Sequence, residues 1–353
     1  MAQNASDDEK FMRIALAEAA KANPSPNPKV GAVIAKNGEL LSKGFHAEAG
    51  TPHAEIIAMQ KLLPSQLSGS TLYVTLEPCS HYGRTPPCTT AIINSKIARV
   101  VFGAHDANPK VQGEEILLHA NIDVVGGVLE KESRELNKFF FFAMENSRPH
   151  VTLKWAMSAD GKISTAGGAS KWITCEEMRM RARQIRGSSD AVLVGVGTIL
   201  ADNPTLGGPK HRIVLDSHLR TPANSKIFGS GNVVIFALKK GADMKRKAVL
   251  EKYGAKVFLL SHTTPKAILF QLHKLEIRSC FVEGGGETHA RFVQQKLYDR
   301  IIIYLSPKLI GGKDAKTPVE GEGVKNVPKM PAHAITSITK IGNDVEIVME
   351  KSF

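Results

Sequence analysis

Apolar residues along the first 147 positions follow the period of a helix in some stretches and alternate with polar residues in others. Phe11, Ile14 and Ala15 keep helical spacing. The proline-rich stretch 24–28 ends that helix, because proline cannot continue the hydrogen-bond ladder. Residues 72–76 alternate strictly, as expected of a strand. The same patterns predict strands at residues 30–35, 39–45 and 99–103 and helices at residues 53–63, 89–96 and 130–146.

Strand and helix patterns also alternate along the rest of the chain, and such alternation is typical of sheets covered by helices. A short polar stretch with a proline, residues 146–149, separates the two halves. We therefore expect two α/β domains, residues 1–147 and 148–353. The elements predicted for the second domain are strands at 151–156, 190–195, 211–216, 233–238, 256–260 and 279–282, helices ending near 186 and 202, helices at 265–275 and from 288, and a closing hairpin of strands 334–341 and 345–349.

Three residues with metal-binding side chains, His53, Cys79 and Cys88, lie at the ends of predicted elements, so they can converge. One imidazole and two thiolates can bind zinc and leave its fourth position open for water. Glu55 lies two residues from His53 and could carry protons from that water to a departing amine. His-x-Glu followed by Pro-Cys is the pattern of zinc-dependent base deaminases, although eight residues separate the two cysteines here. The alternative interpretation is a set of unrelated core residues.

Composition excludes several classes of protein. The 353 residues, 42% of them hydrophobic, suffice for two domains with real cores. No apolar run reaches the roughly 18 residues of a membrane span, and the first residues lack the features of a signal peptide. We expect a cytoplasmic protein without a membrane partner. Four cysteines do not make a disulfide framework, and Cys175 and Cys280 are interpreted as unpaired.

The net charge of +12 is unevenly distributed. Residues 1–147 carry 14 basic and 16 acidic residues, whereas the remainder carries 32 basic and 18 acidic residues. A basic domain can attract nucleic acid or phosphorylated small molecules, and it can also be a solvated surface without a partner. Because no arginine-rich run is interleaved with aromatic residues, we expect no nucleic-acid partner.

A predicted strand at 279–282 leads into Glu283, the glycines 284–286 and a helix. Free backbone N–H groups and the helix dipole at such a turn can hold a phosphate. The spacing is not that of a Rossmann fingerprint, so a plain tight turn is an equal alternative.

Longer motifs resemble one family along nearly the whole chain, the bifunctional deaminase/reductase of riboflavin biosynthesis. In the first half these are Pro-Asn-Pro-Lys-Val-Gly at 26–31, Gly-Phe-His at 44–46, His-Ala-Glu at 53–55 and Thr-Leu-Glu-Pro-Cys-Ser-His-Tyr-Gly-Arg-Thr-Pro-Pro-Cys at 75–88. In the second half they are Leu-Lys at 153–154, Asp-Gly at 160–161, Ser-Lys-Trp-Ile-Thr at 170–174, Leu-Ala-Asp-Asn-Pro at 200–204 and Glu-Gly-Gly at 283–285. The motif at 75–88 distinguishes this family from cytidine and tRNA deaminases.

The resemblance implies a cytidine-deaminase-like α/β/α domain followed by a dihydrofolate-reductase-like α/β domain. It also implies two reactions on one phosphorylated pyrimidine ribosylamine. Zinc-dependent hydrolysis would release the 2-amino group as ammonia, and NADPH would then reduce the ribose C1′ to give a ribityl chain. The phenylalanine run at 139–142 suggests packing between the two halves or association into a homo-oligomer.

The family's functional residues carry over to matching positions of this sequence. Zinc would be held by His53, Cys79 and Cys88, with Glu55 as the catalytic proton carrier. The deaminase substrate would contact Asn27, His46, His81, Arg84, Asp106 and Asn108. The reductase substrate would contact Lys154, Ser170, Arg186, Leu206 and Glu283. NADPH would contact Ala156, Trp172, Thr198, Asp202, Ser217, Gly285, Gly286, Glu287, Thr288, His289, Ala290 and Arg291. Simpler roles stay open for Leu206 as core, Trp172 as packing and Arg186 as the end of a helix.

One departure from the family pattern concerns the reductase half. Leu206 is followed by Gly207, Gly208 and Pro209, where the family has Thr-x-Arg, so the arginine expected to hold the substrate phosphate is missing. Lys210 and Arg212 are the candidates to replace it, although lysine lacks the guanidinium fork. This altered loop is the support for one rival hypothesis, a deaminase whose second half has become a binding module. The basic charge of the second half supports another, a nucleic-acid deaminase that holds RNA. NADPH oxidation and salt-dependent RNA binding, respectively, would test them.

Overall fold

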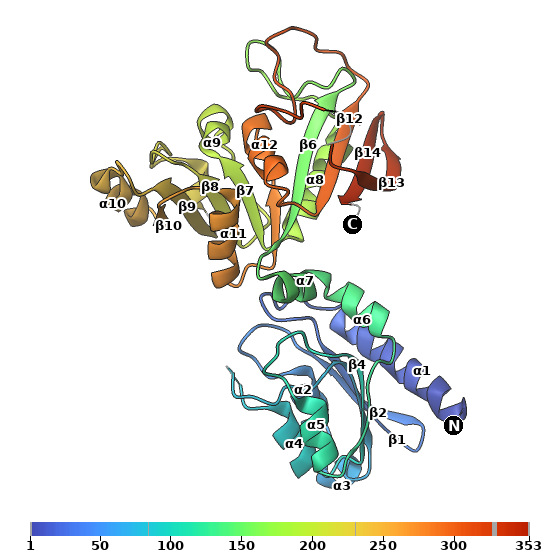
Figure 1. Cartoon of the computed structure of the whole chain (residues 1–353). Coiled ribbons are helices and arrows are strands. Elements are labelled where there is room, and N and C mark those ends of the chain that lie inside the picture. The colour runs from blue at the N-terminus through green and yellow to red at the C-terminus, as the bar shows by residue number, and fades with distance from the viewer. Residues whose placement is uncertain (1, 84, 230, 327–329, 352–353) are drawn as a thin grey trace. The chain divides into compact units, whose positions relative to one another are not determined.

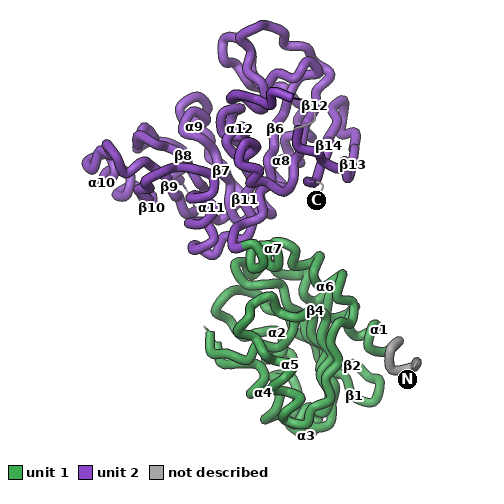
Figure 2. The backbone as a smooth tube through the Cα atoms, in the orientation of Figure 1, with its two compact units in different colours: residues 1–146 green, residues 147–353 purple. Residues whose placement is uncertain are grey.

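The computed structural model describes residues 2–83, 85–229, 231–326 and 330–351. The chain divides into two compact units, residues 1–146 and 147–353 (Figure 2). Each unit is a sheet covered by helices (Figure 1). Within the described part of the chain, every helix is too short or too polar to cross a membrane.

Unit 1 is built on a five-stranded sheet of order β2-β1-β3-β4-β5. Strand β1 runs antiparallel to β2 and β3, whereas β3, β4 and β5 are parallel. Its elements are α1 (Ala2–Ala19), β1 (Gly31–Lys36), β2 (Glu39–Phe45), α2 (Ala54–Met59), α3 (Pro64–Leu67), β3 (Thr71–Leu76), α4 (Cys88–Asn94), β4 (Arg99–Ala104), α5 (Gly113–His119), β5 (Asp123–Val125), α6 (Glu130–Leu136) and α7 (Lys138–Asn146).

Alternation along the strands of unit 1 divides its core into two layers, because successive side chains of a strand point to opposite faces. Ala32 and Ile34 of β1 pack in one cluster with residues of α2, α4 and α5. Val33 and Ala35 of the same strand pack in another cluster with residues of α1. Figure 1 shows α1 and α6 on one side of the sheet and α2, α4 and α5 on the other. The unit is therefore a three-layer α/β/α sandwich.

Two helix predictions in unit 1 were wrong in extent. The single helix predicted at 130–146 is interrupted at Asn137, whose side chain accepts a hydrogen bond from Lys29 N–H (2.8 Å) and donates one to the Lys29 carbonyl (2.8 Å). The helix predicted at 53–63 ends at Met59, and a separate turn, α3, begins at Pro64. In the phenylalanine run, Phe141 is buried with Leu76 and Ala104 in the core of unit 1 itself.

Unit 2 is built on a nine-stranded sheet of order β10-β9-β8-β7-β11-β6-β12-β14-β13. The first seven strands in this order are parallel, and β14 and β13 are antiparallel to their neighbours. Its elements are β6 (His150–Ser158), α8 (Glu176–Gly187), β7 (Ala191–Gly195), α9 (Val196–Asp202), β8 (His211–Leu215), the 3₁₀ turn η1 (Lys226–Gly229), β9 (Asn232–Leu238), α10 (Met244–Lys252), β10 (Ala255–Leu260), α11 (Pro265–Lys274), β11 (Ser279–Val282), α12 (Gly286–Gln294), β12 (Arg300–Ser306), β13 (His333–Ile341) and β14 (Asp344–Lys351).

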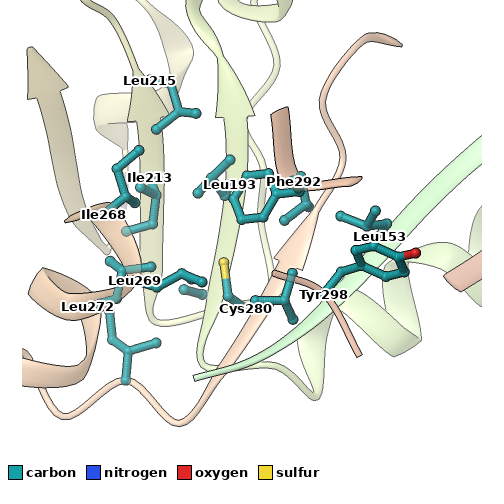
Figure 3. Packing of buried hydrophobic residues seen from close by; sticks show 14 of the residues in the cluster. Leu153, Leu193, Ile213, Leu215, Ile268, Leu269, Leu272, Cys280, Phe292 and Tyr298 are labelled. Atoms are coloured by element: carbon teal, nitrogen blue, oxygen red, sulfur yellow. The ribbon is translucent and has the colours of Figure 1, made fainter. Parts of the chain in front are cut away.

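The core of unit 2 forms because its central strands are apolar on both faces, as buried parallel strands must be. Leu153, Leu193 and Ile213 point to one face, where they meet Ile268 of α11 and Phe292 of α12 (Figure 3). Val192, Val194 and Val214 of the same strands pack on the other face with residues of α9 and α10. Strand β12 was not predicted, although its run of isoleucines lies beside β6.

Candidate active sites

The three predicted metal ligands come together in unit 1. His53 directly precedes α2, Cys79 follows β3 and Cys88 is the first residue of α4. Their ligand atoms all lie within 4.8 Å of one another. His53 Nδ1 is 3.3 Å from Cys88 Sγ and 3.4 Å from Cys79 Sγ, so this nitrogen faces both sulfurs. An imidazole and two thiols at such spacing are the donor set of a catalytic zinc site.

One thiol of this group is prepared for metal binding. The hydrogen bond from the Cys88 side chain, followed by the one with His53, lowers the pKa of Cys79 well below its ordinary value. The backbone N–H of Cys88 also donates to Cys79 Sγ (3.3 Å). A thiolate is the form of cysteine that binds a metal ion. The sequence at the start of α4 therefore supplies both a ligand and a donor that stabilises the neighbouring ligand.

Glu55 lies beside the ligands in the first turn of α2, and its side chain is only 3% exposed. Burial, and next the negative charge of Cys79, raises the pKa of its carboxyl group. Its Oε2 is buried and has no hydrogen-bond partner among the described residues. Such an atom costs free energy unless a further group binds it. An unpartnered carboxylate oxygen beside a His-Cys-Cys group fits a zinc-activated water.

The structure groups most of the predicted deaminase-substrate residues around this cluster. The Asn27 side chain is hydrogen bonded to His46 Nε2 (3.0 Å), and the His46 ring meets the His53 ring edge-on with centroids 5.2 Å apart. Burial lowers the pKa of His46, which keeps its ring neutral. Arg84 lies outside the described residues.

Two of the three remaining predicted residues, Asp106 and Asn108, lie on the loop after β4, and the third, His81, lies on the loop after Cys79. Asp106 accepts a hydrogen bond from Asn108 N–H (2.8 Å). Burial raises the pKa of Asp106 to about 6. The charge of Cys79 also raises this pKa, whereas that of His81 lowers it. His81 Nδ1 is buried without a partner among the described residues. Asp106 therefore lies near His81 and near the metal ligand Cys79.

Sequence reasoning missed two residues of this site. Glu77, directly after β3, is buried and accepts hydrogen bonds from the N–H groups of Asp106 (3.3 Å) and Glu114 (3.1 Å). It therefore fixes the Asp106 loop beside the strand that leads to Cys79. Thr85 Oγ1 lies 3.1 Å from His53 Nε2, the ring nitrogen that does not face the sulfurs. In the sequence, the only indication of the contact between Thr85 and His53 is the unusual length of the loop between Cys79 and Cys88.

In unit 2, three predicted substrate residues form a charged group. Glu283, at the carboxyl end of β11, lies 2.8 Å from Arg186 Nη1 and 3.5 Å from Lys154 Nζ. The three side chains are 14–16% exposed, so they are sheltered but reachable. Arg186 also donates to the Gly207 carbonyl (3.1 Å), and Lys154 Nζ lies over the Tyr304 ring. A carboxylate held between two cations can accept further hydrogen bonds from a polar ligand.

The glycine turn before α12 leaves one open position. A Cβ at Gly284 would lie 2.4 Å from Thr288 Cβ, and a Cβ at Gly286 would lie 2.4 Å from the Thr317 carbonyl oxygen. A Cβ at Gly285 would meet no atom within 4 Å. Gly284 and Gly286 allow the backbone to pack closely against Thr288 and Thr317. Gly285 has open space beside it, which leaves the start of the nine-residue helix α12 accessible. This geometry fits a phosphate-bearing cofactor.

Other residues assigned to the NADPH site differ in accessibility. In α12, Glu287 is exposed, Arg291 is partly buried, and Thr288, His289 and Ala290 are buried. The His289 ring is fully buried between two main-chain carbonyls, those of Pro318 (2.9 Å) and Val282 (3.4 Å). Its contacts therefore fix the start of α12.

The remaining NADPH positions cluster at the carboxyl ends of parallel strands, where ligands bind in open α/β sheets. Thr198 and Asp202 lie on α9, directly after β7, and Asp202 is 3.6 Å from Lys171. Ser217 follows β8 and is hydrogen bonded to Thr263 (3.3 Å). Ala156 lies in β6 and is partly buried.

Trp172 is 64% exposed, and the Arg179 guanidinium lies over its ring with 4.5 Å to the centroid. Its carbonyl accepts a hydrogen bond from Lys308 (3.1 Å). Ser170, in the same loop, is partly buried. An exposed indole with a cation on one face leaves the loop open to a flat ligand.

The structure favours the core interpretation of Leu206. Its side chain is 5% exposed and packs with apolar residues of β7, β8 and β9. Arg212 donates from Nε to the Leu206 carbonyl (3.3 Å) and is itself only 3% exposed. Arg212 therefore stabilises the altered loop from its buried side, whereas Lys210 is exposed to solvent.

Comparisons with known proteins match both units. Residues 5–104 match the cytidine and deoxycytidylate deaminase zinc-binding region, and residues 149–347 match the RibD C-terminal domain. The expected order of a cytidine-deaminase-like domain followed by a dihydrofolate-reductase-like domain is confirmed. The riboflavin biosynthesis protein RibD of Aquifex aeolicus is 39% identical, with 98% of each chain covered. That of Escherichia coli is 34% identical, with 96% of this chain and 98% of the relative covered.

Solved structures agree along the full length. RibD of Acinetobacter baumannii superposes with a TM-score of 0.89 at 30% identity, covering 99% of this chain and 100% of the other. A diaminohydroxyphosphoribosylaminopyrimidine deaminase/5-amino-6-(5-phosphoribosylamino)uracil reductase of Thermotoga maritima superposes with a TM-score of 0.83 at 33% identity, with the same coverage. With its zinc-type ligand group in one unit and a reductase fold in the other, this chain belongs to the RibD family of bifunctional deaminase/reductases of riboflavin biosynthesis.

Proposed function

We propose that unit 1 hydrolyses 2,5-diamino-6-(5-phosphoribosylamino)pyrimidin-4(3H)-one to the uracil and ammonia, and that unit 2 then reduces the ribosyl C1′ with NADPH. The product would be 5-amino-6-(5-phosphoribitylamino)uracil. The observation that carries the proposal is the buried Glu55 carboxyl group, whose Oε2 has no hydrogen-bond partner among the described residues, beside His53, Cys79 and Cys88. The reactions named for the Thermotoga maritima relative, which this chain covers completely, support the choice of substrate.

In the deaminase, one zinc ion per chain would be held by His53 Nδ1, Cys79 Sγ and Cys88 Sγ. Bound zinc lowers the pKa of a water molecule towards neutrality. Glu55 would take a proton from the attacking water as the C–O bond forms, and would deliver it to the 2-amino group as the C–N bond breaks in a second step. Because burial raises the pKa of Glu55, its carboxyl group can hold the proton between these two steps.

Recognition of the pyrimidine falls to the groups around this cluster. The hydrogen bond between Asn27 and His46 fixes the Asn27 amide, which leaves its remaining polar atoms for a base edge. Asp106 and His81 offer a carboxyl group and a ring nitrogen on the Cys79 side. Hydrogen bonds of this kind reject analogues that lack the matching group.

In the reductase, NADPH would lie along the carboxyl ends of β7, β8 and β11, with a phosphate near the open Gly285. NADPH supplies the hydride for C1′. Glu283 would accept hydrogen bonds from the sugar hydroxyls, and Arg186 and Lys154 hold that carboxylate in place. For the substrate phosphate, exposed Lys210 is the available cation of the altered loop, because Arg212 is buried beneath it.

Two half-assays test the proposal on the full chain. Ammonia release from the diaminopyrimidinone substrate tests unit 1, and NADPH oxidation with the deaminated product tests unit 2. We expect both, and we expect the protein to act as a homo-oligomer. Ammonia release without any NADPH oxidation at high protein concentration would favour the alternative in which unit 2 is an inactive, reductase-like module. NADH used as well as NADPH would contradict the cofactor assignment.

A further inference from the structure

The loop between Cys79 and Cys88 places a hydroxyl group against the imidazole of His53. Thr85, three positions before Cys88, has its Oγ1 3.1 Å from His53 Nε2. We propose that Thr85 is a positioning residue, which holds the His53 ring in the orientation and tautomer that bind zinc through Nδ1. The inference rests on the proposed zinc site and adds a residue to it.

The two ring nitrogens of His53 have different surroundings. Nδ1 faces both sulfurs, at 3.3 and 3.4 Å, and Nε2 faces Thr85. A neutral imidazole carries its proton on one nitrogen only. When Nδ1 gives its lone pair to a metal ion, the proton lies on Nε2 and can be donated to Thr85 Oγ1. Metal-binding histidines commonly donate their second N–H in this way, which fixes the ring and strengthens the ligand.

Among the described residues, the hydrogen-bond partner of His53 Nε2 is the Thr85 hydroxyl. His53 occupies the position before α2, but its side chain makes no capping hydrogen bond. Apart from the two sulfurs beside Nδ1, the His46 ring touches it edge-on at 5.2 Å. Without the Thr85 hydroxyl, the Nε2–H group would lie in a partly buried site without that acceptor, and an unsatisfied donor is costly. The long spacing between the cysteines thus supplies a contact that a two-residue spacing has too few residues to make.

Thr85→Val tests the inference, because valine keeps the shape of threonine and removes the hydroxyl. Thr85→Ser restores the hydroxyl, and Thr90→Val, at an exposed threonine of α4, is the matched control. Zinc affinity of each full-length variant is measured by competition with a chromophoric chelator, independently of activity. We expect Thr85→Val to bind zinc about 10- to 100-fold more weakly than the wild type. Thr85→Ser and Thr90→Val should stay close to the wild type.

A second readout distinguishes the hydrogen bond from general packing. In the cobalt-substituted protein, the Nε2–H of a metal-bound histidine gives a shifted, solvent-exchangeable proton signal. We expect this signal in the wild type, Thr85→Ser and Thr90→Val, and faster exchange with solvent in Thr85→Val. Equal zinc affinity and equal exchange in Thr85→Val and the wild type would overturn the role of Thr85 alone. A wild type that binds no zinc would instead overturn the proposed metal site itself.

Discussion

Replacing Glu55 by glutamine removes the proposed proton carrier and keeps its volume. The side chain is 3% exposed, and its Oε2 has no partner among the described residues, so an amide of the same shape fits without a lost hydrogen bond. An amide cannot carry the proton from water to the leaving amine. General acid–base catalysis contributes about 10²- to 10⁴-fold. A loss in that range corresponds to about 2.7–5.4 kcal/mol of transition-state stabilisation.

The other buried carboxylates described near the metal ligands are already engaged in hydrogen bonds. Glu77 is engaged by two backbone N–H groups, and Asp106 by the N–H of Asn108. We therefore expect the upper part of the range for the fall in kcat of ammonia release. Zinc content should not change, because Glu55 is not among the three ligands.

The assay compares ammonia release by the wild type, Glu55→Gln and the control Glu48→Gln, which changes an exposed carboxylate of the same unit. NADPH oxidation with the deaminated substrate reports on unit 2 and should be equal in all three. Near-normal ammonia release by a zinc-loaded Glu55→Gln protein would refute the assignment of Glu55. Loss of zinc in that variant would show that Glu55 supports the metal site instead.

Two further predictions concern unit 2. Glu283→Gln weakens the contacts with Arg186 (2.8 Å) and Lys154 (3.5 Å), so NADPH oxidation should fall strongly while ammonia release continues; unchanged kcat/KM for reduction would contradict the role of Glu283. Because hydrogen bonds to charged groups are worth about 1.5–3 kcal/mol, urea unfolding should also show unit 2 destabilised within that range. Burial lowers the pKa of His289 below its ordinary value of 6.5, so the folded state favours the neutral ring. The resulting stability is complete above pH 6.5 and is lost as the pH falls. Thermal unfolding of His289→Gln between pH 7.5 and 5 should therefore depend less on pH than that of the wild type, and an equal dependence would contradict this reasoning.

The fold class and most strands follow from local patterns, but long-range contacts decide the details. Residues 130–146 have no helix breaker in their sequence, and the interruption at Asn137 comes from a pair of hydrogen bonds to Lys29, 108 positions away. Strand β12 is a short apolar run that pattern alone does not distinguish from other buried segments. Its pairing with β6 and β14 in the sheet identifies this run as a strand.

Some residues of the candidate sites can likewise be predicted from the sequence, whereas others depend on long-range contacts. His53, Glu55, Cys79 and Cys88 are recognisable because the chemistry of zinc restricts both residue type and spacing. The contact between Thr85 and His53 depends on the path of a loop, and no spacing rule predicts it. Leu206 lies in a motif of the family, but whether its side chain faces a ligand or the core depends on the packing of β7, β8 and β9.

The most direct test of the account is metal analysis combined with the two half-assays on the same full-length protein. We predict one zinc ion per chain. Its removal by a chelator should abolish ammonia release and leave NADPH oxidation with the deaminated substrate intact, and added zinc should restore the first activity. Folded, metal-free protein that releases ammonia at an unchanged rate would contradict the central claim.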